Sequence, residues 1–164
     1  MNINKVFYKE IDCVMLLIED AIIEMKRNGV YQWDEIYPDK MLMLGDITSS
    51  SLYAVRLNEN IAGIMTLNET QAPEYHSLSW SDSDGHPLIV HRLCIHPSFQ
   101  GQGFSKLLMY FAENYARENK YSSIRLDAFI NNKKAVGLYD SLSYQRKGIV
   151  KFRKGDFYCY EKLL

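Results

Sequence analysis

Cysteine is scarce in this chain of 164 residues, which contains only Cys13, Cys94 and Cys159. The three are odd in number and far apart, so they supply neither a disulfide framework nor the paired spacing of a zinc site. Each lies in a mainly apolar stretch, which predicts buried free thiols. Three of the four histidines likewise show no ligand spacing with one another or with the cysteines, so we expect no metal.

An excess of charge of one sign is also lacking. The 19 Lys and Arg and 20 Asp and Glu residues give a net charge of -1, so no global field attracts nucleic acid or an anionic membrane. No apolar run approaches the roughly 20 residues that span a bilayer, and no secretory signal is recognisable at the N-terminus. We therefore expect a cytoplasmic protein without nucleic-acid or membrane partners. Its length predicts a single domain, residues 1–164.

What the sequence does contain is an apolar run at residues 88–95 that leads into a glycine-rich turn, Gln100–Ser105. Apolar residues then recur at helical offsets from Phe104 to Tyr115, so residues 88–119 predict a strand, a turn and a helix. Such a turn can hold a phosphate or pyrophosphate, because the first N–H groups of a helix have no partner inside it. It can equally serve only to give the backbone a positive φ.

Two nucleotide-binding motifs with similar turns do not fit. A Walker A loop needs Gly-Lys followed by Ser or Thr, whereas Gly103 is followed by Phe104. A dinucleotide fingerprint would need a third glycine where Lys106 stands.

The remaining elements follow from periodicity and turn residues. These predict strands at residues 3–8, 51–57, 61–67 and 123–129, helices at residues 11–28, 39–47 and 131–142, and a closing hairpin at residues 144–164.

The glycine turn resembles the acetyl-CoA-binding signature of the GNAT N-acetyltransferase superfamily. That signature has Arg or Gln, two residues, Gly, one residue, and then Gly or Ala. Gln100, Gly103 and Ser105 stand at those three places, with serine replacing the smaller residue.

A later stretch is similar to the second GNAT signature. It contains Asn132, Ala135 and Tyr139 and ends in Ser143-Tyr144, where the family usually has Gly-Phe. Two signatures in the expected order and at the expected distance are far more specific than either alone.

The resemblance implies a mixed α/β, GNAT-like fold with a twisted, mostly antiparallel sheet of about seven strands and about four helices. It also implies that the strand at residues 88–95 splays from the strand at residues 124–129, and that acetyl-CoA, the co-substrate, lies in the cleft. The backbone N–H of Cys94 would face the thioester oxygen. The cofactor-binding residues implied in this way are Leu93, Cys94, Ile95, Gln100, Gly101, Gln102, Gly103, Phe104, Ser105 and Asn132, of which Asn132 could instead be only a helix cap.

The implied activity is transfer of an acetyl group from acetyl-CoA to a primary amine by direct attack. Tyr139 matches the family tyrosine that protonates the departing thiolate, and this proton transfer costs only ~2 kcal/mol between unperturbed groups. The ring could instead be ordinary core packing. The general base is open among His91, Glu74, Glu35 and water.

Two segments are candidates for acceptor binding, residues 30–38 and the long polar stretch 68–86. The acceptor is a small-molecule or peptide amine, and loop acids would favour a cationic one. Large aromatics in these segments could instead only anchor them to the core. The candidate acceptor-binding residues are Trp33, Glu35, Tyr37, Glu74, Tyr75 and Trp80.

Two other functions remain open. A non-catalytic acyl-CoA-binding sensor or partner-binding domain with the same fold would keep the cleft without turnover. A longer-chain acyltransferase would differ in its preferred acyl group. Association into a homodimer is also left open.

Overall fold

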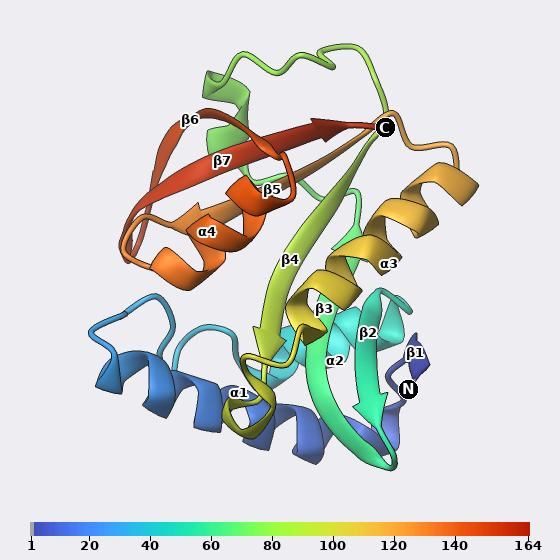
Figure 1. The fold of residues 1–164 in the computed structure, drawn as a ribbon, viewed down its shortest axis with the longest axis vertical. Coiled ribbons are helices and arrows are strands. Elements are labelled where there is room, and N and C mark those ends of the chain that lie inside the picture. Colours follow the sequence, from blue (N-terminus) through green and yellow to red (C-terminus); the bar gives the residue numbers. More distant parts are fainter. Residues whose placement is uncertain (1) are drawn as a thin grey trace. The chain divides into compact units, whose positions relative to one another are not determined.

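The computed structural model describes residues 2–164, which form two compact units. Of the described residues, unit 1 comprises 2–67 and Arg92–Phe111, and unit 2 comprises Asn68–His91 and Ala112–Leu164. The strand β4 (Pro87–Ile95) and the helix α3 (Phe104–Glu118) each pass from one unit into the other (Figure 1). Seven strands in the order β1-β2-β3-β4-β5-β7-β6, together with four α-helices, confirm the predicted mixed α/β class.

In unit 1, the predicted hairpin is present. The strands β2 (Leu52–Leu57) and β3 (Asn60–Asn68) pair antiparallel, and β1 (Asn2–Lys5) adds to the other side of β2. The turn between β2 and β3 is tight because Asn58 adopts a φ of 56°, a left-handed conformation that asparagine tolerates.

The helices of unit 1 lie where residues 11–28 and 39–47 were predicted to be helical. Helix α1 (Ile11–Arg27) is followed by Gly29 with a φ of 71°. Helix α2 (Lys40–Thr48) is capped by Asp39, whose side chain accepts a hydrogen bond from the Leu42 N–H at 2.8 Å.

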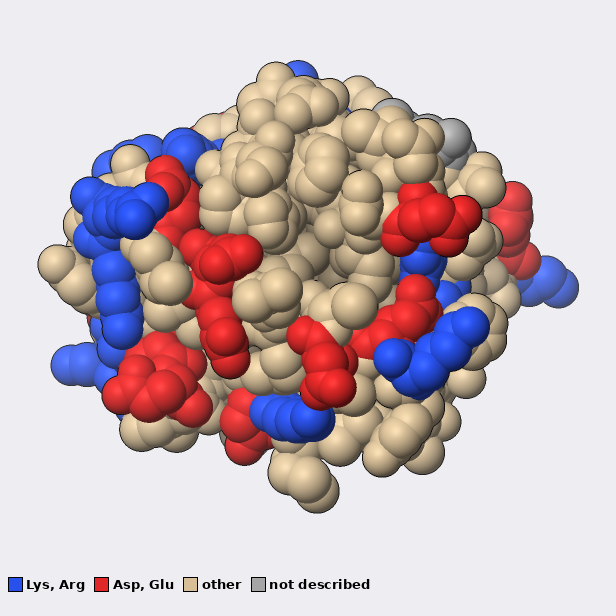
Figure 2. Space-filling model, turned by 90° about the horizontal axis from the view of Figure 1, so that it is seen from below, with Lys and Arg blue, Asp and Glu red and all other residues tan. Residues whose placement is uncertain are grey.

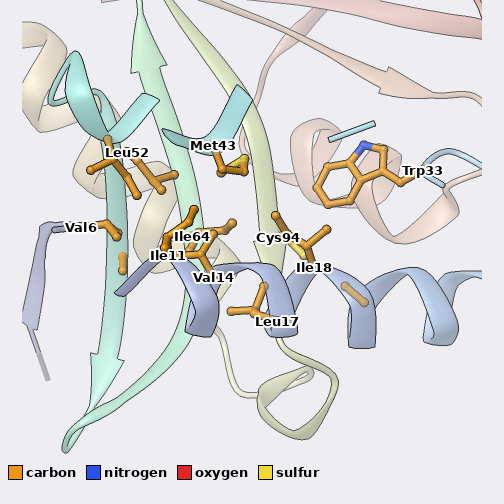
Figure 3. Close-up of a cluster of buried hydrophobic side chains, with 13 residues drawn as sticks. Val6, Ile11, Val14, Leu17, Ile18, Trp33, Met43, Leu52, Ile64 and Cys94 are labelled. Atoms are coloured by element: carbon orange, nitrogen blue, oxygen red, sulfur yellow. The ribbon is translucent and has the colours of Figure 1, made fainter. Parts of the chain in front are cut away.

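The core of unit 1 lies between α1, α2 and the strands (Figure 3). The helical spacing of Ile11, Val14 and Ile18 turns one face of α1 inward, as predicted. Leu17, which is also buried, belongs to the same face. The prediction that all three cysteines are buried is wrong for Cys13, which is exposed because it lies off this face of α1.

Unit 2 is built around β5 (Ser123–Phe129). The N-terminal half of β4 runs parallel to β5, with Pro87 opposite Ser123 and Ile89 opposite Arg125. Within unit 2 this parallel register ends at Ile89, whereas β5 stays paired with β7 as far as Phe129. From Leu126 onward, therefore, the β4-facing edge of β5 has no strand partner in unit 2.

The closing hairpin is confirmed, with β6 (Gln145–Phe152) antiparallel to β7 (Gly155–Leu163). The second strand of the hairpin, β7, inserts between β5 and β6. Helix α4 (Lys133–Ser141) follows β5, and the stretch 68–86, predicted to be irregular, contains a short 3-10 helix, η2 (Pro73–Ser77). None of the helices in residues 2–164 combines the length and the apolar character that crossing a bilayer demands.

Candidate active site

The glycine turn of unit 1 has the geometry of an anion-binding site. Gly101 and Gly103 have φ values of 76° and 86°, and a Cβ built on either one would have no atom of residues 2–164 within 4 Å, apart from the glycine itself and its two chain neighbours. The turn leads directly into α3, where the N–H of Leu107 donates to the carbonyl of Gly103 at 3.1 Å. The N–H groups of the first helical residues before Leu107 therefore have no partner inside the helix. Open space beside exposed N–H groups fits a diphosphate.

The side chains of this turn contact neighbouring residues of unit 1 and so stabilise its conformation. The Gln100 amide donates to the carbonyl of Ile95 at 3.3 Å, and the Gln102 amide donates to that of Ser98 at 3.2 Å. Phe104 is buried and packs edge to face on Phe99. A ligand at this turn would therefore meet mainly backbone.

The part of β4 that precedes the turn is distorted. Arg92 has a φ of 51°, which is rare for a residue other than glycine and breaks the regular pleat of the strand. The residues after it, Leu93 to Ile95, are those predicted to face the pantetheine arm and the thioester. The Cys94 side chain points into the core of unit 1, where burial raises its pKa to about 12. This thiol is thus not a nucleophile at neutral pH.

In unit 2, α4 carries Tyr139 and begins at Asn132. The Asn132 side-chain oxygen accepts a hydrogen bond from the Ala135 N–H at 3.1 Å, so Asn132 is the helix cap that was one of its two predicted roles. Its contact with the cofactor remains a prediction.

Tyr139 is 5% exposed, and its ring packs against those of Tyr144 and Tyr160. Its hydroxyl forms no hydrogen bond with any of residues 2–164 and is not among their fully enclosed polar atoms that lack a partner, so solvent or a ligand can reach it. Burial and, second, the charge of Asp127 raise the pKa of Tyr139 well above its ordinary value. The phenol therefore keeps its proton at neutral pH.

Asp127 is a candidate that the sequence reasoning missed. It lies on β5, half-buried, and one carboxylate oxygen accepts a hydrogen bond from the Tyr75 hydroxyl at 2.7 Å. Tyr75 is itself 2% exposed, and its carbonyl accepts from the Trp80 indole N–H at 2.9 Å. The only signal in the sequence was a carboxylate on the face of the strand opposite Leu126, five residues before Asn132.

The polar stretch of residues 68–86 is held down rather than free. Glu161, on β7, is buried and accepts from the backbone N–H groups of Ser81 at 2.7 Å and Asp82 at 3.3 Å. Arg125 donates to Glu161 at 3.3 Å and stacks on the Trp80 ring, with 4.4 Å to its centroid. These contacts fix the two predicted acceptor-binding aromatics of this stretch, Tyr75 and Trp80, onto unit 2.

The predicted acceptor-binding residues of residues 30–38 are in unit 1. Trp33 is 6% exposed and belongs to the core cluster, which is the anchoring role that aromatics were also predicted to have. Tyr37 and Glu35 are exposed. Their contact with an acceptor remains a prediction.

Several loop acids are engaged within the chain. Asp34 accepts from backbone N–H groups of its own turn, and Asp82 accepts from the hydroxyls of Ser122 and Ser123. The side chains of Glu35 and Glu74 are exposed and form no ion pair or hydrogen bond within residues 2–164. Acidic and basic side chains are interspersed on the face drawn in Figure 2, around an uncharged area.

His91, the histidine considered as a base, forms a hydrogen bond between Nε2 and the Asn68 side-chain oxygen at 3.0 Å. The role of His91 as a base remains a prediction.

Comparison with known proteins identifies similar chains. The model of the Acetyltransferase (GNAT) family matches residues 18–144. The uncharacterized N-acetyltransferase YesJ of Bacillus subtilis (strain 168) is 22% identical over 145 residues, which cover 86% of this chain and 79% of the relative.

Solved structures have the same fold. A GNAT-family acetyltransferase from Streptococcus agalactiae has a TM-score of 0.85 and 25% identity, covering 99% of this chain and 95% of the other. The NatC complex bound to Gag peptide and CoA contains a chain with a TM-score of 0.73 and 14% identity, covering 99% of this chain and 98% of the other.

Proposed function

Because the chain belongs to the Acetyltransferase (GNAT) family, we propose that it transfers the acetyl group of acetyl-CoA to a primary amine by direct attack. The observation that carries this proposal is the turn at Gly101 and Gly103, whose open space and unpaired helix N–H groups suit the diphosphate of the coenzyme. The thioester would supply the activated acetyl group, and the residues of the chain would bind it and move the protons.

We assign the base to Asp127. An alkylammonium acceptor has a pKa near 10.4 and must lose a proton before its nitrogen can attack. A carboxylate beside Tyr139, held by the hydroxyl of Tyr75, can accept that proton directly or through a water molecule. The nitrogen then forms its bond to the acyl carbon, the carbon–sulfur bond breaks, and Tyr139 protonates the sulfur. The second proton lost by the nitrogen returns through water to the Tyr139 oxygen, and Asp127 releases its proton to solvent.

The two protonation steps are coupled through charge. The carboxylate charge of Asp127 is one cause of the raised pKa of Tyr139, after burial. When Asp127 takes up the proton of the amine, that charge disappears and Tyr139 becomes a better acid. Proton uptake at the base thus prepares the acid for the step in which the thiolate leaves.

A direct assay of acetyl transfer tests the proposed function. The chain is incubated with acetyl-CoA and a panel of small amines, amino acids and peptides, and free CoA thiol is measured. The peptide arm is included because the NatC complex was solved with a peptide bound. We expect release of CoA that depends on at least one acceptor. Tight binding of acetyl-CoA without any acceptor-dependent release would instead favour a sensor, and faster turnover of succinyl-CoA or longer acyl-CoA would identify another acyltransferase.

Substitution of Asp127 tests the base. Asp127→Asn should lower kcat/KM by about 100-fold or more, as loss of a general base usually does, and should remove the acidic limb of its pH profile. Asp156→Asn, which removes an exposed carboxylate of the same unit, is the matched control and should change neither. Full activity of the Asp127→Asn enzyme would transfer the base role to another group or to water.

A further inference from the structure

A buried ion pair lies next to the distorted part of β4 in unit 1. The Arg92 guanidinium donates from Nε to Asp46 Oδ2 at 2.9 Å and from Nη2 to Asp46 Oδ1 at 2.8 Å. The two side chains are only 7% and 8% exposed. The Thr66 hydroxyl, also buried, donates to Asp46 Oδ2 at 2.8 Å, so the carboxylate is held from β3 as well as from β4.

The pair joins three elements at one point. Asp46 is on α2, Thr66 on β3 and Arg92 on β4. The third nitrogen of the guanidinium, Nη1, lies 3.4 Å from the Tyr37 hydroxyl, in the segment predicted to bind the acceptor. A fork of fixed geometry that contacts both carboxylate oxygens restrains the direction of the Arg92 side chain, and through it the backbone of Arg92.

Stability alone does not explain this arrangement. Removing two charges from water costs nearly as much as their attraction returns, so a buried ion pair is often no more stabilising than apolar residues of similar size. The backbone of Arg92, at a φ of 51°, adds strain that a regular strand would avoid. Strain held in place by a satisfied polar network points to a positioning role.

The neighbouring backbone is also restrained. A Cβ built on Gly63 of β3 would lie 2.9 Å from the Cys94 carbonyl oxygen and would also clash with an Ile95 side-chain carbon. The residues just after Arg92 are therefore pressed closely against β3. Between the ion pair on one side and this contact on the other, the backbone around Cys94 has little freedom to turn.

We propose that Asp46 and Arg92 are positioning residues that hold the β4 distortion, so that the backbone N–H of Cys94 is aimed at the thioester oxygen of acetyl-CoA. This inference rests on the proposed function, because it concerns the same reaction. Neither side chain needs to touch the thioester, since both act through the backbone.

A pair of ligands isolates the contact in question. Acetyl-CoA and S-ethyl-CoA have the same length, but only acetyl-CoA has a carbonyl oxygen. A single hydrogen bond to that oxygen should make acetyl-CoA bind about threefold to tenfold more tightly than S-ethyl-CoA. The two Kd values are measured by calorimetry without an acceptor. Their ratio reports whether the Cys94 N–H is oriented to bond the thioester oxygen, because damage to the rest of the cofactor site would weaken both ligands equally.

In Arg92→Ala and in Asp46→Asn we expect this ratio to fall to about one, and kcat to fall by about tenfold to 100-fold while the Kd for S-ethyl-CoA stays within about twofold. Arg92→Lys, which keeps the charge but not the fork, should give an intermediate ratio and is the variant to use if the others do not fold. Arg56→Ala is the matched control. It breaks another Arg ion pair of unit 1, with Glu10 at 2.8 Å, and should leave the ratio unchanged.

The outcomes are distinguishable. Folded Arg92 variants that keep the wild-type ratio would overturn the positioning role while leaving the proposed function intact. A wild-type protein that neither binds nor turns over acetyl-CoA would overturn the proposed function itself. If the variants lose affinity for acetyl-CoA and S-ethyl-CoA by the same factor, the Asp46–Arg92 ion pair only supports the fold, and the positioning role is refuted.

Discussion

Replacement of Tyr139 by phenylalanine should separate catalysis from stability. The hydroxyl forms no hydrogen bond with residues 2–164, so its removal breaks no contact of the folded chain and should change the free energy of unfolding by no more than about 0.5 kcal/mol. Loss of the proton donor for the thiolate, in contrast, should lower kcat by about 100-fold or more. The Kd for acetyl-CoA should stay the same, since the phenol acts on the departing sulfur.

Tyr144 offers the matched control near the end of the same helix. Its hydroxyl donates to the buried carboxylate of Glu113 at 3.3 Å. Tyr144→Phe breaks that bond and should cost about 1 kcal/mol, which for a chain of this size lowers Tm by about 2 to 4 °C. Its kcat should remain that of the wild type.

The assay is CoA release at saturating substrates for kcat, calorimetry for the Kd of acetyl-CoA, and thermal denaturation for Tm. Two variants that each lose one oxygen should thus show opposite behaviour, one in kcat and the other in Tm. Wild-type turnover by Tyr139→Phe would refute the acid role of Tyr139. An equal loss of kcat in both variants would also count against it, because the loss would then come from disturbed packing near α4.

Two further predictions concern stability and thiol reactivity. Ser143 has a φ of 63°, so Ser143→Gly should raise the free energy of unfolding by about 0.5 to 1 kcal/mol. Ser141→Gly, at the last residue of α4, should lower it by about 0.5 kcal/mol. Urea titration that gave the same sign for both variants would contradict this. At pH 8 a thiol reagent should label Cys13 alone in the folded protein and all three cysteines after unfolding, because burial raises the pKa of Cys94 and Cys159 to about 12. The folded state keeps these thiols protonated, so stability should fall as the pH rises above about 9. Rapid labelling of two or more thiols in the native protein would be inconsistent with the burial of Cys94 and Cys159.

Much of the fold could be predicted because its signals are local. The strand at residues 123–129 begins and ends where the alternation of side chains does, and α1 ends at its Asn28-Gly29 stop. In α3 the large apolar residues did mark the buried side, but Ala112 and Ala116 are more deeply buried than Phe111 and Tyr115. Small residues allow close packing at the centre of a helix face, and periodicity of large residues does not register them.

The candidate site could be predicted only where a motif carried it. The glycine turn and Tyr139 came from the two GNAT signatures. Asp127 and Tyr75 are 52 positions apart, and Arg92 and Asp46 are 46 apart, so no spacing along the chain indicates that they meet. The positive φ of Arg92 is also invisible in the sequence, because arginine does not favour that conformation and tertiary contacts impose it.

The same kind of non-local dependence governs how unit 2 can assemble. β7 lies between β5 and β6 in the sheet but follows both in the sequence. During synthesis, β6 therefore has no strand to pair with until β7 has left the ribosome. A growing chain must therefore keep β5 and β6 apart, with their edges uncovered, after β6 ends at Phe152 and until β7 is complete at Leu163. Premature termination within β7 would leave one edge of β5 and one edge of β6 without a partner at the same time.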